Sequence, residues 1–516
     1  MRLAGGFHLP AAHSCCAGPG ALGCSLRGRP PPAASIKNQQ RKSQALKYIS
    51  TRGQAPSLDF EDVLLAGLAR DGGLYLPESW PRFSQEEIEG FAGKRFSDAA
   101  VEVLTPYVGD GISRSDLQKM AEAAYASFGH AAVTPLVQID RNRFVLELFH
   151  GPTLAFKDVA MQLLARLMDH VLQKRGARAT IVGATSGDTG GAAIEAFRGS
   201  KNVDVFILFP EGRVSDVQRR MMTTPKESNV HAVAVKGTFD DCQALVKAMF
   251  NHHDFRDRVQ LSGVNSINWA RIVAQVTYYF VAATALGGAR RPVSFAVPTG
   301  NFGDIFAGYV AKRMGLNIDR LVIASNENDI LPRTLKTGAY EMREVKATTS
   351  PSMDIQISSN FERYLFEACG RRADLVRGQM DSLTQARRFD VGAEVAQVLR
   401  GDFAAAKASE AEVADTIRRV KASSGYLVDP HTACAVSAAE RVLGADDGVP
   451  QIVLSTAHPA KFPDAMEAIT GVRPGLPERL SSLLTNEERY PIIDNDLSAI
   501  ESFIEHNARA IRQGQL

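Results

Sequence analysis

The sequence lacks a net charge of either sign. Its 516 residues include 59 Lys+Arg and 57 Asp+Glu, which gives a formal net charge of only +2. This balance gives no support to a nucleic-acid footprint on the chain as a whole, so we expect no nucleic-acid partner. Hydrophobic residues make up 45% of the chain and charged residues 22%. That composition allows a large core and excludes a disordered, coiled-coil or collagen-like protein.

Acidic residues are missing from the start of the chain. Residues 1–58 contain no Asp or Glu, whereas residues 1–45 carry six basic residues and three of the six cysteines. The same stretch shows no helical or strand period. We interpret residues 1–45 as a disordered leader, either an over-extended gene model or an organelle transit peptide. We expect a cytoplasmic protein in the first case and an organelle protein in the second.

Metal-ligand spacings and membrane-length apolar runs are also missing. Cys242, Cys369 and Cys434 are widely spaced, without C-x-x-C or histidines at zinc spacing, so we expect no metal and small buried thiols. The longest uncharged run, residues 272–289, contains Gln275 and several Thr and Tyr residues. A buried core helix explains this run better than a membrane span, and we expect no membrane partner.

From about residue 140, short apolar strands alternate with helices. We expect strands at 144–149, 179–182, 203–209, 230–235, 293–297, 321–324 and 451–454, and helices at 159–172, 190–197, 217–222, 240–250 and 304–314. This alternation predicts right-handed βαβ units and an open parallel α/β sheet, with ligands beyond the carboxyl ends of the strands. Residues 46–135 form a separate, mostly helical unit, and residues 345–420 are mostly helical with less clear boundaries.

Three loops rich in small polar residues follow strands of this sheet. The loop 149–158 places Lys157 at the start of a helix, where the helix dipole and burial would favour a nucleophilic amine. The loops 183–191 and 298–304 could bind anions through backbone N–H groups at helix N-termini. Taken singly, they also fit a surface lysine and two capped turns. We place all of them at the same edge of one sheet, where they suggest pyridoxal phosphate.

Several segments together resemble threonine synthases of the longer branch found in many bacteria and in fungi. The segments are Tyr48–Gly53, Asp71–Pro77, His150–Asp158, Gly183–Gly190, Ser266–Arg271, Gly300–Asp304 and Ser455–Phe462. The resemblance runs from about residue 46 to the C-terminus. It implies the tryptophan-synthase-β-like fold of pyridoxal-phosphate enzymes (fold type II), with two interleaved α/β domains over residues 136–516. It also implies a carbon–oxygen lyase that converts O-phospho-L-homoserine and water to L-threonine and phosphate, the last step of threonine biosynthesis.

The resemblance implies roles for individual residues. The implied cofactor residues are Lys157 for the Schiff base, Gly300, Asn301, Phe302 and Gly303 for the cofactor phosphate, and Thr456 for the pyridine nitrogen. The implied substrate residues are Ser186, Asp188 and Thr189 for the carboxylate, with Asn268 and Arg271 nearby. Among these, Arg271 could bind the substrate phosphate bidentately.

Two other functions stay open at this point. A threonine-synthase-like phospho-lyase would share every motif but release 2-oxobutyrate and ammonia. A non-catalytic protein of the same fold would bind its ligand for regulation or assembly, although an intact Lys157 and all three loops argue against such decay. For the oligomeric state we expect a monomer or a homodimer.

Overall fold

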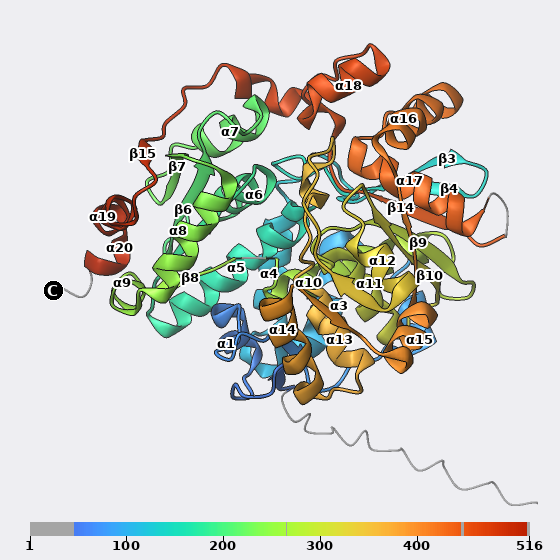
Figure 1. The fold of residues 1–516 in the computed structure, drawn as a ribbon, viewed down its shortest axis with the longest axis horizontal. Helices are drawn as coiled ribbons and strands as arrows, with labels where there is room; N and C mark the ends of the chain where they lie inside the picture. Colours follow the sequence, from blue (N-terminus) through green and yellow to red (C-terminus); the bar gives the residue numbers. More distant parts are fainter. Residues whose placement is uncertain (1–45, 265, 445–447, 513–516) are drawn as a thin grey trace, which may run out of the picture. The chain divides into compact units, whose positions relative to one another are not determined.

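The structure is a computed structural model that describes residues 46–264, 266–444 and 448–512 (Figure 1). The leader expected at residues 1–45 lies outside these residues. The described chain begins with a small antiparallel pair of strands, β1 (Tyr48–Ser50) and β2 (Tyr75–Pro77). The helices of this part are α1 (Phe60–Ala66), α2 (Gln85–Glu89), α3 (Phe96–Val108), η1 (Gly109–Gly111) and α4 (Arg114–Tyr125). Helices outnumber strands in this stretch, as expected, whereas its separation from the rest of the chain stays a prediction.

A six-stranded sheet has the order β13-β10-β9-β14-β4-β3. Its strands are β3 (Leu136–Asp140), β4 (Arg143–Glu147), β9 (Val293–Pro298), β10 (Ile318–Ser325), β13 (Phe403–Lys407) and β14 (Gln451–Ser455). Every pair of neighbouring strands in this sheet is parallel except β3 and β4, which form an antiparallel hairpin at the edge of the sheet. A two-residue turn is enough to join antiparallel strands, whereas each parallel pair needs a long crossover.

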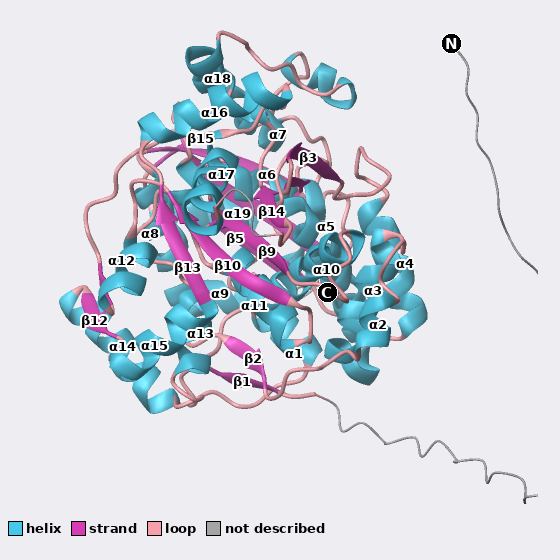
Figure 2. Ribbon diagram, turned by 90° about the vertical axis from the view of Figure 1, so that its right-hand side faces the viewer, coloured by secondary structure: helices cyan, strands magenta, loops and turns pink. Residues whose placement is uncertain are grey.

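A second sheet has five strands in the order β15-β7-β6-β5-β8, all parallel. Figure 1 labels β6, β7, β8 and β15 of this sheet, and Figure 2 labels β9, β10 and β13 of the six-stranded sheet. Its strands are β5 (Ala179–Ala184), β6 (Val203–Pro210), β7 (Val230–Lys236), β8 (Leu261–Ser262) and β15 (Ile492–Asp494). Every residue of β6 is buried, which is typical of a parallel strand covered on both faces. Such burial explains the hydrophobic runs that predicted β5, β6 and β7. The short strands β8 and β15 were not predicted, and neither is buried.

Two long helices, α5 (Lys157–Arg175) and α10 (Trp269–Ala285), pack against each other in the interior. Nearly every side chain of α10 is buried, so the uncharged run at 272–289 is a core helix, as predicted. No helix of the described chain is long and apolar enough to cross a membrane. The thiols of Cys242, Cys369 and Cys434 are buried and free, which confirms the expectation for them.

The remaining elements include a separate antiparallel pair of strands, β11 and β12. They are α6 (Asp188–Phe197), α7 (Asp216–Thr223), α8 (Phe239–Asn251), α9 (His253–Arg258), α11 (Gly303–Arg313), α12 (Ile330–Thr337), β11 (Ala339–Glu341), η2 (Pro351–Met353), α13 (Phe361–Ala368), α14 (Ala373–Ala386), β12 (Arg388–Asp390), α15 (Ala393–Asp402), α16 (Glu410–Ser424), α17 (Pro430–Leu443), η3 (Pro459–Lys461), α18 (Pro463–Thr470), η4 (Glu478–Leu484), α19 (Leu497–Asn507) and α20 (Arg509–Arg512).

The topology corrects one expectation. The three polar loops do not follow strands of a single sheet, because the loops 149–158 and 298–304 follow β4 and β9 of the six-stranded sheet, whereas the loop 183–191 follows β5 of the five-stranded sheet. The alternation of strands and helices along the sequence is the same for one sheet and for two, because it does not specify which strands are neighbours. The division of the body at residue 135 stays a prediction, since residues 45–516 cluster as one unit.

Candidate active site

Lys157 is the first residue of α5, as its position in the sequence predicted. The loop that carries it lies against the loop that follows β14: the Phe156 N–H donates to the Thr456 carbonyl at 2.9 Å, and Ala155 forms an isolated bridge with Ala457. Lys157 and Thr456 follow the ends of β4 and β14, which are far apart in the sequence. The contact between their loops brings the two residues together. The side chain of Thr456 is buried, in keeping with a role inside the site.

The Lys157 ammonium lies in a buried, polar environment. Its Nζ is 3.2 Å from Oδ2 of Asp188 and 3.5 Å from Oγ of Ser352. Burial lowers the pKa of Lys157; Asp188 opposes this change, whereas the positive charges of Lys461 and Arg271 add to it. The net lowering favours the neutral amine, which is the nucleophilic form.

Asp188 serves as the counter-ion of two lysines. Its Oδ2 accepts from Lys157 and Ser352, while its Oδ1 lies 2.5 Å from Nζ of Lys461 and accepts from Nε2 of Gln218 at 2.8 Å. Burial alone would raise the pKa of Asp188, but the two ammonium groups hold it well below its usual value. An ionised carboxylate has no N–H or O–H to donate, so binding of the substrate carboxylate by the Asp188 side chain stays a prediction.

The backbone around Asp188 does suit an anion. Gly187 has a φ of 143°, and a Cβ there would lie 2.5 Å from the Gln218 side chain, so only glycine fits. The hydroxyl of Thr185 accepts from the N–H groups of Gly187 and Gly190, and no side chain caps the N-terminus of α6. The N–H of Gly190 is therefore occupied, whereas those of Asp188 and Thr189 begin the helix directly after exposed Ser186; the Thr189 side chain is half-buried.

The loop 300–303 has the geometry of a phosphate cradle. The carbonyl of Gly300 accepts from Oγ of Ser358 at 2.6 Å, and the carbonyl of Asn301 accepts from the backbone N–H of Asn360 at 3.0 Å. In a trans peptide the N–H points opposite to the C=O. The N–H groups of Asn301 and Phe302 therefore point away from residues 358–360, together with the uncapped start of α11.

Phe302 holds this loop in place through its side chain. Its φ of 61° is left-handed, which is unusual for a residue other than glycine, asparagine or aspartate. The ring is 1% exposed and packs against Phe361, Tyr364 and Phe403. The side chain of Phe302 thus anchors the strained turn in the core and leaves only the backbone to contact a ligand, so the contribution of Phe302 to cofactor binding stays a prediction.

Arg271 is a buried cation near these loops. Its side chain is 2% exposed and donates from Nη1 to the Val264 carbonyl at 3.0 Å. Its Nε has no hydrogen-bond partner among the described residues. Burial lowers the pKa of Arg271 to about 10. A buried guanidinium with an unused N–H suits a phosphate ligand, which could satisfy it and stabilise its charge.

Asn268 has a structural role in this geometry. Its Oδ1 accepts from the Ala270 N–H and caps α10, and its Nδ2 donates to the Leu64 carbonyl at 2.9 Å. Both ends of the amide are occupied by the protein itself. Contact between Asn268 and a substrate stays a prediction.

Three residues of the site were missed by reasoning from the sequence: Lys461, Ser352 and Gln218. Lys461 lies in the segment Ser455–Phe462, which already carried the family resemblance. That segment could therefore have indicated Lys461 as a site residue. Ser352 lies in η2, and its N–H donates to Nε2 of His431, whose Nδ1 contacts Asp429. Neither Ser352 nor Gln218 belongs to a recognisable pattern, because each reaches Asp188 only through the tertiary fold.

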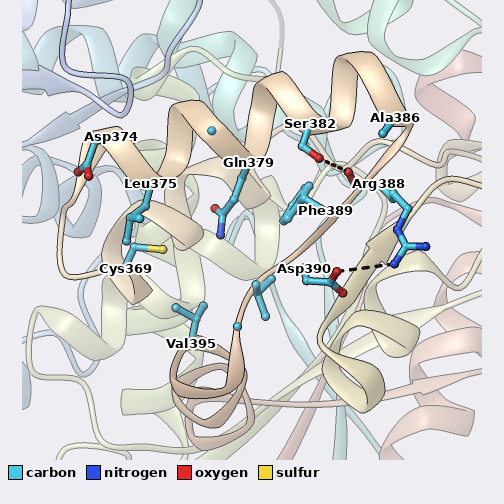
Figure 3. Close-up of a pocket in the computed structure, with 13 residues that line it drawn as sticks. Cys369, Asp374, Leu375, Gln379, Ser382, Ala386, Arg388, Phe389, Asp390 and Val395 are labelled. Atoms are coloured by element: carbon cyan, nitrogen blue, oxygen red, sulfur yellow. Dashed lines mark hydrogen bonds and ion pairs between the residues drawn. The ribbon is translucent and has the colours of Figure 1, made fainter.

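A cavity of about 610 Å³ lies elsewhere, between α14, β12 and the start of α15 (Figure 3). Its lining includes Cys369, Gln379 and Phe389, and the charged pair Arg388 and Asp390. None of the predicted site residues lines it. The volume of this cavity therefore does not identify the reactive centre, which is defined by its converging polar groups.

Comparisons with known proteins agree with this geometry. The family described as "Threonine synthase N terminus" matches residues 47–125, "Pyridoxal-phosphate dependent enzyme" matches residues 128–454, and "Threonine synthase, C-terminal" matches residues 432–504. A threonine synthase of Pseudomonas aeruginosa is 51% identical over 460 residues, covering 89% of this chain and 98% of the relative.

Solved structures show the same likeness. A PLP-bound threonine synthase from Brucella melitensis has a TM-score of 0.88 and 60% identity, covering 90% of this chain and 100% of that chain. Threonine synthase from yeast has a TM-score of 0.86 and 41% identity, covering 90% of this chain and 99% of that chain.

Proposed function

The chain belongs to the threonine synthase family of pyridoxal-phosphate-dependent enzymes, and from this premise we propose the roles of its individual residues. The protein is a pyridoxal-phosphate-dependent lyase of fold type II. Its reaction is that of threonine synthase: O-phospho-L-homoserine and water give L-threonine and phosphate. The bound cofactor supplies an electron sink that stabilises negative charge next to the amino group.

Lys157 is the residue that holds the cofactor covalently and then moves protons. It is the first residue of α5, its side chain is 12% exposed, and the preceding Phe156 N–H donates to the Thr456 carbonyl. When the substrate is bound, the free Lys157 amine would be the group that takes the proton from Cα. After it hands that proton on, the same amine could take one from Cβ. Such transfers require an amine whose pKa lies near the working pH, and burial lowers the pKa of Lys157 in that direction.

The phosphates of cofactor and substrate bind at two different places. The N–H groups of residues 301–303 hold the cofactor phosphate, and Arg271 binds the phosphate of the substrate, which leaves from Cγ. Thr456 offers the pyridine nitrogen a neutral hydroxyl rather than a carboxylate. Ser186 and Thr189, with the first N–H groups of α6, hold the substrate carboxylate.

The observation that carries these assignments is the buried amine of Lys157, 3.2 Å from Asp188 and beside two anion-binding loops. The purified protein should show visible absorbance from bound cofactor, and Lys157→Ala should abolish it. Incubation with O-phosphohomoserine should yield threonine together with phosphate. If 2-oxobutyrate is the only organic product, the phospho-lyase is the correct function. A colourless protein that takes up no added pyridoxal phosphate refutes both.

Three broader assignments belong to the same proposal. The body consists of an N-terminal unit at 46–135 and a catalytic region at 136–516, and residues 1–45 are a leader. The protein acts in the cytoplasm, or in an organelle if residues 1–45 are a transit peptide. It acts as a monomer or homodimer, without nucleic acid or membrane. Light scattering of the purified chain, and N-terminal sequencing of the protein from its own cells, test these assignments.

A further inference from the structure

Lys461 is a second buried lysine in the site. Its side chain is 0% exposed, and its Nζ contacts only two oxygen atoms among the described residues: Oδ1 of Asp188 at 2.5 Å and the Thr153 carbonyl at 3.0 Å. A fully buried ammonium is expensive to desolvate, and a methionine of similar length would fill the same space without that cost. The retention of a charge at this place needs a reason.

The geometry around Asp188 supplies one. Lys461 and Gln218 bind its Oδ1, whereas Lys157 and Ser352 bind its Oδ2, so the carboxylate is shared between two ammonium groups on opposite sides. With both lysines protonated, this buried group of three carries a net positive charge. Without Lys461, Asp188 would be available to Lys157 alone, as a one-to-one ion pair.

The charged groups that face the Lys157 nitrogen come from four elements. They are Asp188 on α6, Lys461 on η3, Arg271 on α10 and Asp304 on α11. Three of the five side chains are cations, counting Lys157 itself. Within the described part of the chain, Lys461 contacts Asp188 directly, whereas Arg271 donates to the Val264 carbonyl instead.

We propose that Lys461 is a positioning residue: by binding Oδ1 of Asp188 it turns Oδ2 toward Lys157, and by its positive charge it prevents Asp188 from holding Lys157 in the protonated form. The inference rests on the proposal that Lys157 carries the cofactor. It adds a role for Lys461 in making the Lys157 nitrogen available for proton transfer.

The test is a pH titration of the visible absorbance of the full-length holoenzyme. The absorbance reports protonation of the nitrogen that joins Lys157 to the cofactor, and it does not depend on turnover. Lys461→Gln keeps a hydrogen-bonding side chain but removes the charge. We expect its titration midpoint to rise by about one pH unit, a roughly tenfold gain in proton affinity. Lys461→Arg should restore a midpoint close to that of the unchanged protein.

A matched control removes a lysine that pairs with a carboxylate outside the site. Lys174 contacts Oε1 of Glu61 at 2.7 Å, and Lys174→Gln should leave the midpoint unchanged. Asp188→Asn provides a second test if Lys461→Gln does not fold. Loss of the carboxylate should lower the titration midpoint, the opposite direction to that expected for Lys461→Gln.

The outcomes separate this inference from the proposal on which it rests. If folded and coloured Lys461→Gln titrates like the unchanged protein, or if Lys461→Arg behaves like Lys461→Gln, the role of Lys461 is refuted. The same refutation follows if Asp188→Asn leaves the midpoint unchanged. If instead Lys157→Ala keeps the colour of bound cofactor, the assignment of Lys157 itself is wrong.

Discussion

The substitution Gly300→Ala tests the architecture of the cofactor cradle. A Cβ at Gly300 would lie 2.6 Å from the backbone oxygen of Ser352 and 3.4 Å from Cα of Met353. Both neighbours are main-chain atoms of η2, so neither can rotate away as a side chain can. The loop 300–303 and η2 must therefore separate. Overpacking of this kind typically costs about 1–3 kcal/mol.

That cost should appear as a loss of cofactor affinity, because the displaced segments carry the phosphate cradle and the Ser352 hydroxyl beside Lys157. A cost of about 1–3 kcal/mol corresponds to a roughly 5- to 150-fold weaker binding of pyridoxal phosphate. Titration of the cofactor-free protein with pyridoxal phosphate, followed by absorbance, measures the change.

Gly378→Ala is the matched control for this measurement. Gly378 lies in α14, and a Cβ there would have no atom within 4 Å, so the substitution should leave cofactor affinity unchanged. Alanine should also stabilise this helix, by about 0.5–1 kcal/mol. If Gly300→Ala binds pyridoxal phosphate as tightly as Gly378→Ala does, the close approach of η2 does not shape the cradle and our reasoning fails.

Three further predictions follow from the same site. Arg271→Lys keeps the charge but loses bidentate binding, so kcat/KM for O-phosphohomoserine should fall about 10- to 100-fold while the cofactor colour remains; unchanged kinetics would exclude a phosphate contact. Burial raises the pKa of Asp304 to about 7, so its contribution to stability is complete below about pH 4 and is lost as the pH rises through 7. The stability of Asp304→Asn relative to the unchanged protein should therefore rise by roughly 2.5 kcal/mol between pH 5 and pH 8, measured by urea unfolding. If the two proteins differ by the same amount at both pH values, the prediction is contradicted. Gly187→Ala should lower kcat/KM about tenfold or more, because its Cβ would displace Gln218 from Asp188; a normal kcat/KM would show that this contact is dispensable.

The reactive lysine and its loops were predictable from local pattern. A strand, a short polar loop and an amphipathic helix place Lys157 at a helix start, and the structure puts it there. The same reasoning located the loops before α6 and α11. It could not reveal that Asp188 pairs with two lysines, because they stand 31 and 273 residues away from it in the sequence.

The sequence by itself determined the α/β class, the buried helix α10 and the positions of the polar loops, because hydrophobic periodicity and glycine placement act over a few residues. Only the tertiary structure decided that these loops belong to two sheets, and that Lys157 and Lys461 share one carboxylate. Strand order and through-space charge depend on which distant segments pack together. The chemistry of the Lys157 amine is therefore set by groups from α6, α10 and η3 that no local pattern connects.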